Sequence, residues 1–554
     1  MIKQILQISI VFSIALSFVG CGSEESSSVA STGGSTITST GNPSTYSATK
    51  YDMQYKGLSF YNEELPIGNY KLSSLTDNDF DTLSDSQQLL VADKLLSSMF
   101  FAYPLHELQE KIDSGTFISS LQEQLNVETT DKAWLESYII NEDIFGTGEN
   151  HDQEVVDILK RFYFAKDLDK YYFHNWVAYI LTQTIMFSPA YELSSTHAPN
   201  VEGVYNRLVN MLDDEVGMRF ITYSHMMSED NWRRFRSPED NGREMLEIYT
   251  LDLDDSHVPI AGQALQNWKL DTDGNTLVVG LNANTQTLSL FGTTIVNGDD
   301  FYRELAKSSS FTYGVVNRLV SFFFTDYTAS QMNSITNTIV SSKPETWQDI
   351  LKQIIFSKEY LLSSSRAKSA EEVLFPLVKK MDYDIWSQTL THWKSSLDKM
   401  NQASMKYKLG RLTRVPLDTL SFINYYQKIR AVLLNRTNPV YVNNDSDDYT
   451  HDDREGWRDS FLDKINSSLN VNHQEESLEL LIDYIFQLII SREATVDEMA
   501  MFKSYMLEGS SLKDTFDMFN SSGNIITDKR NAIAYIVLEY ISRLDDLYMQ
   551  KGVN

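Results

Sequence analysis

The chain has 554 residues, of which 42% are hydrophobic and 12% aromatic, so it can bury a large core and wholesale disorder is excluded. Its formal net charge of −29 argues against nucleic acid as a partner, because phosphate binding needs a basic surface. Cys21 is the only cysteine, which excludes an intrachain disulfide and any metal site built from several cysteines.

The first predicted element is an export signal at residues 1–20. Lys3 gives a short positive start, and an apolar run from Ile5 to Val19 leads to a glycine and then to Cys21. The pattern resembles a bacterial lipoprotein signal, in which Cys21 is lipidated and becomes the mature N-terminus; the alternative is an ordinary signal peptide with an incidental cysteine. The run is too short and too serine-interrupted for a good spanning helix. Gly22, rather than aspartate, follows the cysteine, which favours the outer membrane.

The next segment, residues 21–52, is rich in Ser, Thr and Gly and is predicted to be a flexible tether. From about Asp85 onward, apolar residues recur at spacings of three and four, which predicts helices. The stretch from Asp169 to Phe187 is apolar nearly all round and predicts a central, buried helix. The predicted fold is therefore mainly α, a multi-helix globular array with a core at residues 53–380 and a C-terminal helical region at 381–554 packed on it.

One region breaks the helical pattern. β-branched alternation and turn residues in segment 269–296 predict a small β insertion of two or three short strands. Helices resume after it, and Thr495 with Glu498 has the spacing of a capping box. The acidic stretch from Asn443 to Trp457 has many oxygen donors and could hold Ca²⁺, although a solvated loop is the simpler interpretation. No other metal site is predicted.

The segment "SPEDNGREMLEIYTLD" predicts a well-capped helix. Ser237 is expected as its N-cap, with Pro238 at the first helical position. Glu239, Arg243 and Glu247 follow at intervals of four residues, so they predict an ion-pair ladder worth about 0.2–0.5 kcal/mol per pair when exposed.

Glu244 lies one position round the same helix and faces like charges with no base of its own. Like-charge neighbours raise a carboxylate pKa, which is how acid–base sites and cation sites are built. Two interpretations stay open for Arg243, Glu244 and Glu247: a structural strut, or a ligand or catalytic site. Two interpretations also stay open for His174, which lies on the apolar row of the predicted central helix. It is either a catalytic residue or a hydrogen-bonded core residue, and most histidines on an apolar face are of the second kind.

Several motifs in the same order resemble those of a large bacterial family, domain of unknown function 1800. The positions that match its motifs are Glu239, Arg243, Glu244, Glu247, Thr250 and Leu251 in the signature, Leu265 and Trp268 in the next motif, His174 and Asn175 upstream, and Lys368 and Glu372 downstream. The chain departs from the family pattern at Trp176, where a second histidine belongs, and at Leu288, where lysine is expected. The resemblance runs from roughly residue 85 to the C-terminus.

This resemblance implies a secreted or surface-associated, mainly helical protein. Genes of the family often neighbour those of another secreted family, domain of unknown function 1501, whose members resemble alkaline phosphatase-like hydrolases. The resemblance therefore suggests a secreted protein of that second family as a partner. The missing histidine and lysine imply that any active site built on those positions is lost or altered here.

Two functions follow as alternatives. The first is a lipid-anchored helical protein of the bacterial outer membrane, periplasmic or surface-exposed, that binds or presents a partner; its candidate binding residues are Arg243, Asn175 and Trp268. The second is a hydrolase-like enzyme whose candidate catalytic residues are Glu244, Glu247 and His174. The sequence has no GxSxG, Walker A or GxGxxG motif. "HELQE", at 106–110, lacks the second histidine of the zincin motif and predicts a surface helix.

Overall fold

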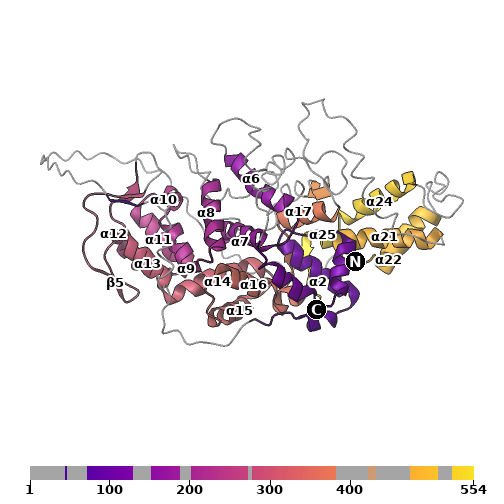
Figure 1. Ribbon diagram of the computed structural model, residues 1–554, viewed down its shortest axis with the longest axis horizontal. Helices are drawn as coiled ribbons and strands as arrows, with labels where there is room; N and C mark the ends of the chain where they lie inside the picture. Colours follow the sequence, from indigo (N-terminus) through magenta and orange to yellow (C-terminus); the bar gives the residue numbers. More distant parts are fainter. Residues whose placement is uncertain are drawn as a thin grey trace, which may run out of the picture. The chain divides into compact units, whose positions relative to one another are not determined.

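Helices make up most of the computed structural model, which describes residues 44–46, 72–128, 151–186, 201–271, 277–381, 474–508 and 527–553, with 423, 426, 427, 429 and 430 (Figure 1). The helices before the β insertion are α1 (Asp77–Asp81), α2 (Asp85–Ser98), α3 (Leu105–Asp113), α4 (Phe117–Gln124), α6 (His151–Phe164), α7 (Lys170–Thr184), α8 (Val201–Asp213), α9 (Met218–Met226), α10 (Glu229–Arg234), α11 (Pro238–Thr250) and α12 (His257–Ala264). The prediction of a mainly α fold with a small β insertion is confirmed.

The helices after the insertion are α13 (Gly298–Lys307), α14 (Ser309–Phe323), α15 (Ala329–Ser341), α16 (Trp347–Ile355), α17 (Ala370–Lys380), α21 (Gln474–Ile490), α22 (Val496–Lys503), α24 (Thr527–Ile541) and α25 (Asp545–Tyr548), with π-helical turns η2 (Glu359–Ser363) and η4 (Ser504–Glu508). The predicted capping box at Thr495 and Glu498 is confirmed, because each side chain bonds the backbone of the other at the start of α22.

All the strands are short: β1 (Ser44–Tyr46), β2 (Trp268–Leu270), β3 (Leu277–Val279), β4 (Leu288–Leu290), β5 (Thr293–Ile295), β6 (Arg366–Ala367) and β7 (Met549–Gln550). The described part of the insertion holds four of them, β2 to β5, where the sequence predicts two or three. β4 and β5 form a hairpin whose turn residues, Phe291 and Gly292, have φ of 52° and 77°. Positive φ at both turn positions is the geometry of a type I′ turn, which matches the twist of the strands.

Three residues of the predicted tether, Ser44–Tyr46, form a strand instead. This β1 pairs antiparallel with β3, which also pairs with β2. Thr and Tyr, at positions 45 and 46, have high β-strand propensity. The edge of β3 that does not face β2 has unpaired backbone N–H and C=O groups, with which β1 can form hydrogen bonds. The predictions for residues 1–20, for Cys21, for the rest of the tether and for the acidic stretch at 443–457 fall outside the described residues.

The predicted central helix is confirmed as α7. Every side chain from Tyr172 to Gln183 is buried, and the helix contacts α6, α8, α14 and α16. The helix ends at Thr184, three residues before the predicted limit at Phe187. Because it has neighbours on several sides, an apolar residue is favoured at almost every position.

Two glycines let α11 pack closely against its neighbours (Figure 1). A Cβ on Gly242 would lie 2.7 Å from the Cβ of Ala261 on α12. A Cβ on Gly314 of α14 would lie 2.5 Å from the carbonyl oxygen of Tyr249. Both positions therefore require glycine, and α11 is fixed between α12 and α14.

Residues near the C-terminus contact helices from early in the chain. β7 pairs with β6, and the side chain of Gln550 is buried and bonds Ser98 of α2 and Tyr360 of η2. Lys380 at the end of α17 donates to the carbonyl of Ile489 in α21 over 3.1 Å. In the part of the chain that the structure covers, no helix has both the length and the apolarity needed to cross a membrane.

Candidate functional site

The start of α11 matches the sequence prediction, but its ion-pair ladder does not form. The Ser237 hydroxyl accepts from the backbone N–H of Asp240 over 3.1 Å, and Pro238 is the first helical residue. Arg243 forms its ion pair with Asp255, in the loop before α12, at 3.4 Å, and not with Glu239 or Glu247. The Arg243 side chain is 43% exposed. A salt-bridge strut along the helix is therefore not the role of this arginine.

Glu244 and Glu247 lie near a cation that the sequence prediction overlooked, Arg318 of α14. Arg318 donates its Nε–H to the carbonyl of Ile248 over 2.8 Å and an Nη2–H to the carbonyl of Glu247 over 3.1 Å. Burial lowers the pKa of Arg318, while Tyr249 and the two glutamates act to raise it. The expectation that Glu244 faces only like charges is wrong, because this guanidinium is close enough to interact with it.

Arg318 has a structural task at this position. The last carbonyls of a helix have no partner within the helix and carry partial negative charge, so a guanidinium there satisfies and stabilises them. The sequence did hold a signal: Arg318 is the only charged residue in the apolar run "YGVVNRLVSFFF", and a buried lone charge must find a partner. Which carbonyls it would find could not be inferred from spacing.

His174 is a core residue in a different set of helices. Its Nδ1 lies 2.5 Å from Oδ1 of Asp213 on α8, and its Nε2 lies 3.4 Å from Nε2 of Gln348 on α16. The side chain is only 4% exposed. Both ring nitrogens thus face protein groups, as expected for a hydrogen-bonded core histidine. No described contact joins His174 to Glu244 or Glu247, so the structure does not assemble the three candidate catalytic residues around a common partner.

The candidate binding residue Asn175 also serves the core. The Asn175 amide accepts from Nη1 of Arg161 over 3.1 Å and donates to the carbonyl of Tyr171 over 2.9 Å. Its own carbonyl accepts from the hydroxyl of Tyr205 over 2.6 Å. Asn175 is 1% exposed, so a ligand could not reach it without opening the core.

Trp268, another candidate binding residue, is 2% exposed at the start of β2. Its ring stacks on Trp232 with centroids 6.4 Å apart and meets Tyr302 edge-on at 6.2 Å. Gly298 leaves the space for this ring, because a Cβ there would lie 2.7 Å from the indole. Trp268 therefore anchors the β insertion on the helices.

Nothing in the described ranges holds three or more His, Cys, Asp or Glu side chains in a group suited to a metal ion. The acidic stretch at residues 443–457, for which Ca²⁺ binding is the alternative to a solvated loop, lies outside those ranges. The chemistry available at α11 is that of a half-buried carboxylate pair beside a guanidinium, which suits a structural contact or the binding of a polar group.

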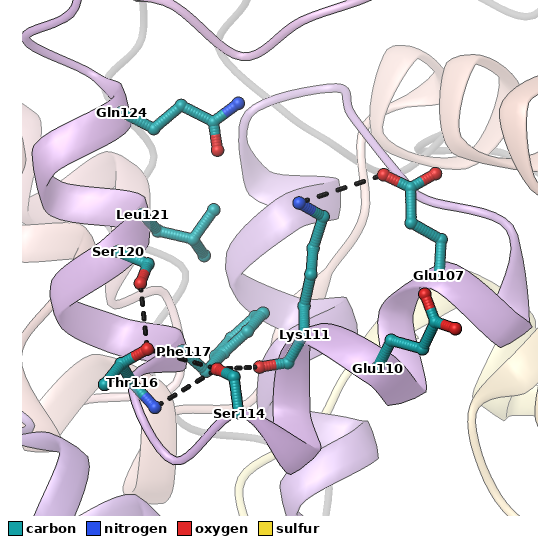
Figure 2. Close-up of a pocket in the computed structure, with 9 residues that line it drawn as sticks. All are labelled: Glu107, Glu110, Lys111, Ser114, Thr116, Phe117, Ser120, Leu121 and Gln124. Carbon is teal, nitrogen blue, oxygen red and sulfur yellow. Dashed lines mark hydrogen bonds and ion pairs between the residues drawn. The ribbon is translucent and has the colours of Figure 1, made fainter.

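An open cavity of about 470 Å³ lies elsewhere, between α3 and α4 (Figure 2). We call it the α3–α4 groove, and it is lined by Glu107, Glu110, Lys111, Ser114, Thr116, Phe117, Ser120, Leu121 and Gln124. The surface helix predicted at "HELQE" is confirmed as part of α3, since the side chain of His106 is 79% exposed. The turn that joins the two helices contains Gly115 at φ 70°.

The groove was not predicted, although part of its signal is in the sequence. A Ser-Gly-Thr turn between two short amphipathic helices predicts a helix pair with a polar outer surface. The depth of a groove depends on which side chains fill the space between the helices, and that is not readable from helical periodicity.

An ion pair with two bonds is buried at β6. Arg366 meets Glu372 with two bonds, Nη2 to Oε1 at 2.6 Å and Nη1 to Oε2 at 2.9 Å, and its Nη2 also donates to the hydroxyl of Tyr360 over 2.6 Å. Burial alone would lower the pKa of Arg366, but Glu372 and Tyr360 raise it above its usual range. Glu372 also caps α17 by accepting from the backbone N–H of Ser369 over 2.7 Å.

A second buried pair lies next to this one. Oδ1 of Asp93 on α2 is 2.6 Å from Nζ of Lys380, and its Oδ2 is 3.7 Å from Nζ of Lys368. Although burial opposes it, the two ammonium groups hold the pKa of the Asp93 carboxyl below its usual range. These contacts join α2 to Lys368 and to the last residue of α17, which lie about 280 positions later in the chain.

No family model matches the chain, and searches of curated proteins and of solved structures find no match either. The resemblance to the domain of unknown function 1800 family therefore stays a prediction based on its motifs.

Proposed function

We propose that the chain is a lipid-anchored protein of the bacterial outer membrane, attached through Cys21, whose helical part binds a partner outside the cytoplasm. The apolar run that ends at a glycine and Cys21, followed by a Ser/Thr/Gly-rich segment, is the observation that carries the anchoring. A myristoyl-sized single chain gives only marginal membrane binding, so the lipid on the cysteine must have more than one acyl chain for stable attachment.

The α3–α4 groove supports the binding half of the proposal. It is an open cavity in the size range of ligand sites, roughly 300–1,000 Å³, and its lining mixes charged, hydroxyl, amide and apolar groups. By contrast, the side chains of His174 and Asn175 are buried and hydrogen-bonded within the core, and the carboxylates of Glu244 and Glu247 on α11 lie near Arg318. These contacts give the hydrolase-like alternative no specific support.

A secreted protein of the domain of unknown function 1501 family is the partner that the resemblance suggests. A tagged full-length chain, isolated from its own cells with mild detergent, is expected to retain a member of that family. Recovery of the chain without such a protein would remove this partner from the proposal while leaving the anchoring untouched.

The anchoring is tested by fractionating cells that express the full-length chain or Cys21→Ala. We expect the wild type in the outer-membrane fraction, labelled by an alkyne palmitate analogue, and Cys21→Ala unlabelled and outside that fraction. Ser23→Ala, two residues away, is the matched control and should behave as the wild type. Equal membrane retention of the wild type and Cys21→Ala, with no label on either, would contradict the proposal.

A further inference from the structure

The floor of the α3–α4 groove is apolar and held in place by the core. Phe117 is only 2% exposed and its ring stacks on Phe80 with centroids 5.1 Å apart, and Leu121 is also 2% exposed. Because both side chains are packed from below, the floor is already formed before any ligand arrives. A preformed surface lowers the entropic cost of binding.

Hydroxyl groups line one side of the groove in a connected row (Figure 2). The Ser120 hydroxyl donates to Oγ1 of Thr116 over 3.1 Å, and the hydroxyls of Thr116 and Ser114 lie 3.1 Å apart. Ser114 in turn donates to the carbonyl of Lys111 over 2.7 Å. Each hydroxyl has two lone pairs and one hydrogen, so the row keeps acceptor sites for an incoming donor.

The upper end of the groove adds a donor. Oε1 of Gln124 accepts from the hydroxyl of Tyr103 over 3.3 Å, which fixes the amide at the upper end of the groove, and its Nε2 group is a donor (Figure 2). Burial raises the pKa of Tyr103 to about 12, so this phenol stays protonated and keeps donating at neutral pH.

The charged groups of the lining already have side-chain partners. Nζ of Lys111 lies 3.8 Å from Oε1 of Glu107 and sits over the ring of Tyr103 at 4.5 Å. Oε1 of Glu110 lies 3.3 Å from Nδ1 of His106, a residue that does not line the groove. A charged ligand would compete with these contacts, whereas a neutral one can bind with them in place.

We propose that the α3–α4 groove binds a neutral saccharide. This proposal names the class of ligand for the binding role in the proposed function, and it rests on that role. Every sugar hydroxyl both donates and accepts, so it can pair with the Ser and Thr hydroxyls, the Gln124 amide and the carboxylates at the rim. A cationic peptide fits less well, because it would displace Lys111 from Glu107.

The test is saturation-transfer difference NMR on the purified full-length chain in detergent. The probes are glucose, galactose, mannose, N-acetylglucosamine and the disaccharides lactose, cellobiose and chitobiose. We expect at least one to bind with a Kd of about 1 mM, a value typical of weak ligand binding at −4.1 kcal/mol. Raising NaCl to about 0.5 M should leave the signal unchanged, because screening acts on charged interactions.

Matched variants on α4 locate the binding. Ser120→Ala and Gln124→Ala should each weaken binding about fivefold, the effect of one lost hydrogen bond. Ser119→Ala and Gln122→Ala change the same residue types outside the lining and should leave the affinity as in the wild type. Thermal melts of all four variants check that they fold.

Three outcomes would overturn the assignment. The first is no signal from any sugar at about 20 mM, well above the expected Kd. The second is binding that Ser120→Ala and Gln124→Ala leave intact. The third is tighter, salt-sensitive binding of an oligolysine probe, which would assign the groove to a cationic partner. Since Cys21-dependent membrane attachment is measured separately, each of these leaves the anchoring proposal standing.

Discussion

Two arginine–carboxylate pairs, Arg243 with Asp255 and Arg366 with Glu372, combine the same chemical groups in opposite surroundings. The first has one contact at 3.4 Å between side chains that are 43% and 89% exposed. The second has two bonds of 2.6 and 2.9 Å between side chains that are 0% and 1% exposed. Only the second pair is held in a single geometry, because the two bonds to Glu372 and a third to the hydroxyl of Tyr360 fix the guanidinium.

The physical difference between the pairs is the cost of losing one member. Water replaces a missing partner at the surface, so an exposed pair contributes about 0–1 kcal/mol. Inside the protein the remaining charge has no such replacement, and removing one partner of a buried pair costs about 3–5 kcal/mol. The arginine that the sequence singled out is thus the less important one for stability.

The largest predicted effect is at Arg366. Arg366→Ala should lower the free energy of unfolding by about 3–5 kcal/mol, because it removes the cation that forms the buried ion pair with Glu372. Urea denaturation followed by circular dichroism measures this change. If the variant does not fold, Arg366→Lys, which keeps a positive charge beside Glu372 but loses the two-bond geometry, should give a milder loss that can be measured. A loss below about 1 kcal/mol in both variants would mean that the pair is as weak as an exposed one.

A second predicted effect, of intermediate size, is a rise of stability with pH above neutrality. Burial lowers the pKa of Lys94 to about 7, with Arg366 nearby adding to the shift, and burial also lowers the pKa of Lys379 to about 7. In the unfolded chain both lysines titrate near 10.4. Between these values the unfolded state binds more protons than the folded state, so stability must increase with pH, by up to about 1.4 kcal/mol per pH unit for each lysine.

Urea denaturation at pH 7.5, 8.5 and 9.5 measures this slope. Buried tyrosines with raised pKa values, such as Tyr205, reverse the trend only above about pH 10, where tyrosine ionises in the unfolded chain. Lys94→Met should reduce the slope by the share of one lysine, up to about 1.4 kcal/mol per pH unit, and Lys166→Met, at an exposed position, should keep it. A flat or falling stability over this range in the wild type would show that the two lysines stay charged in the folded state.

Sequence patterns predicted the local features well and the long-range ones poorly. The N-cap at Ser237, the capping box at Thr495 and the buried central helix depend on residues within one or two turns, and all three are confirmed. The partners of Arg318 and Arg366 depend on tertiary contacts. Arg318 meets α11 about 70 residues earlier in the chain, and no periodicity specifies that distance.

The candidate site shows the same division. The sequence identified the charged row of α11 correctly as residues on a helix, but assigned its ion pairs by helical spacing. In the structure Arg243 turns to a loop residue, Asp255, and the carboxylates lie near Arg318 instead. Sequence spacing shows which side chains are close enough to interact on one helix. Which of these contacts form depends on the groups that the neighbouring helices and loops bring close.

The smallest predicted effect is at Arg243, and it also bears most directly on function. Arg243→Ala should change the free energy of unfolding by about 0.5 kcal/mol or less, and Asp255→Asn by a similar amount. The double variant should show a coupling energy that disappears as NaCl is raised from about 0.05 to 0.5 M, because exposed charges are screened over a few ångströms at high salt. Since stability is nearly unchanged, a loss of partner binding by Arg243→Ala would report a direct role of this side chain. Unaltered binding, together with a stability loss above about 2 kcal/mol, would instead restore the structural strut that the sequence allowed.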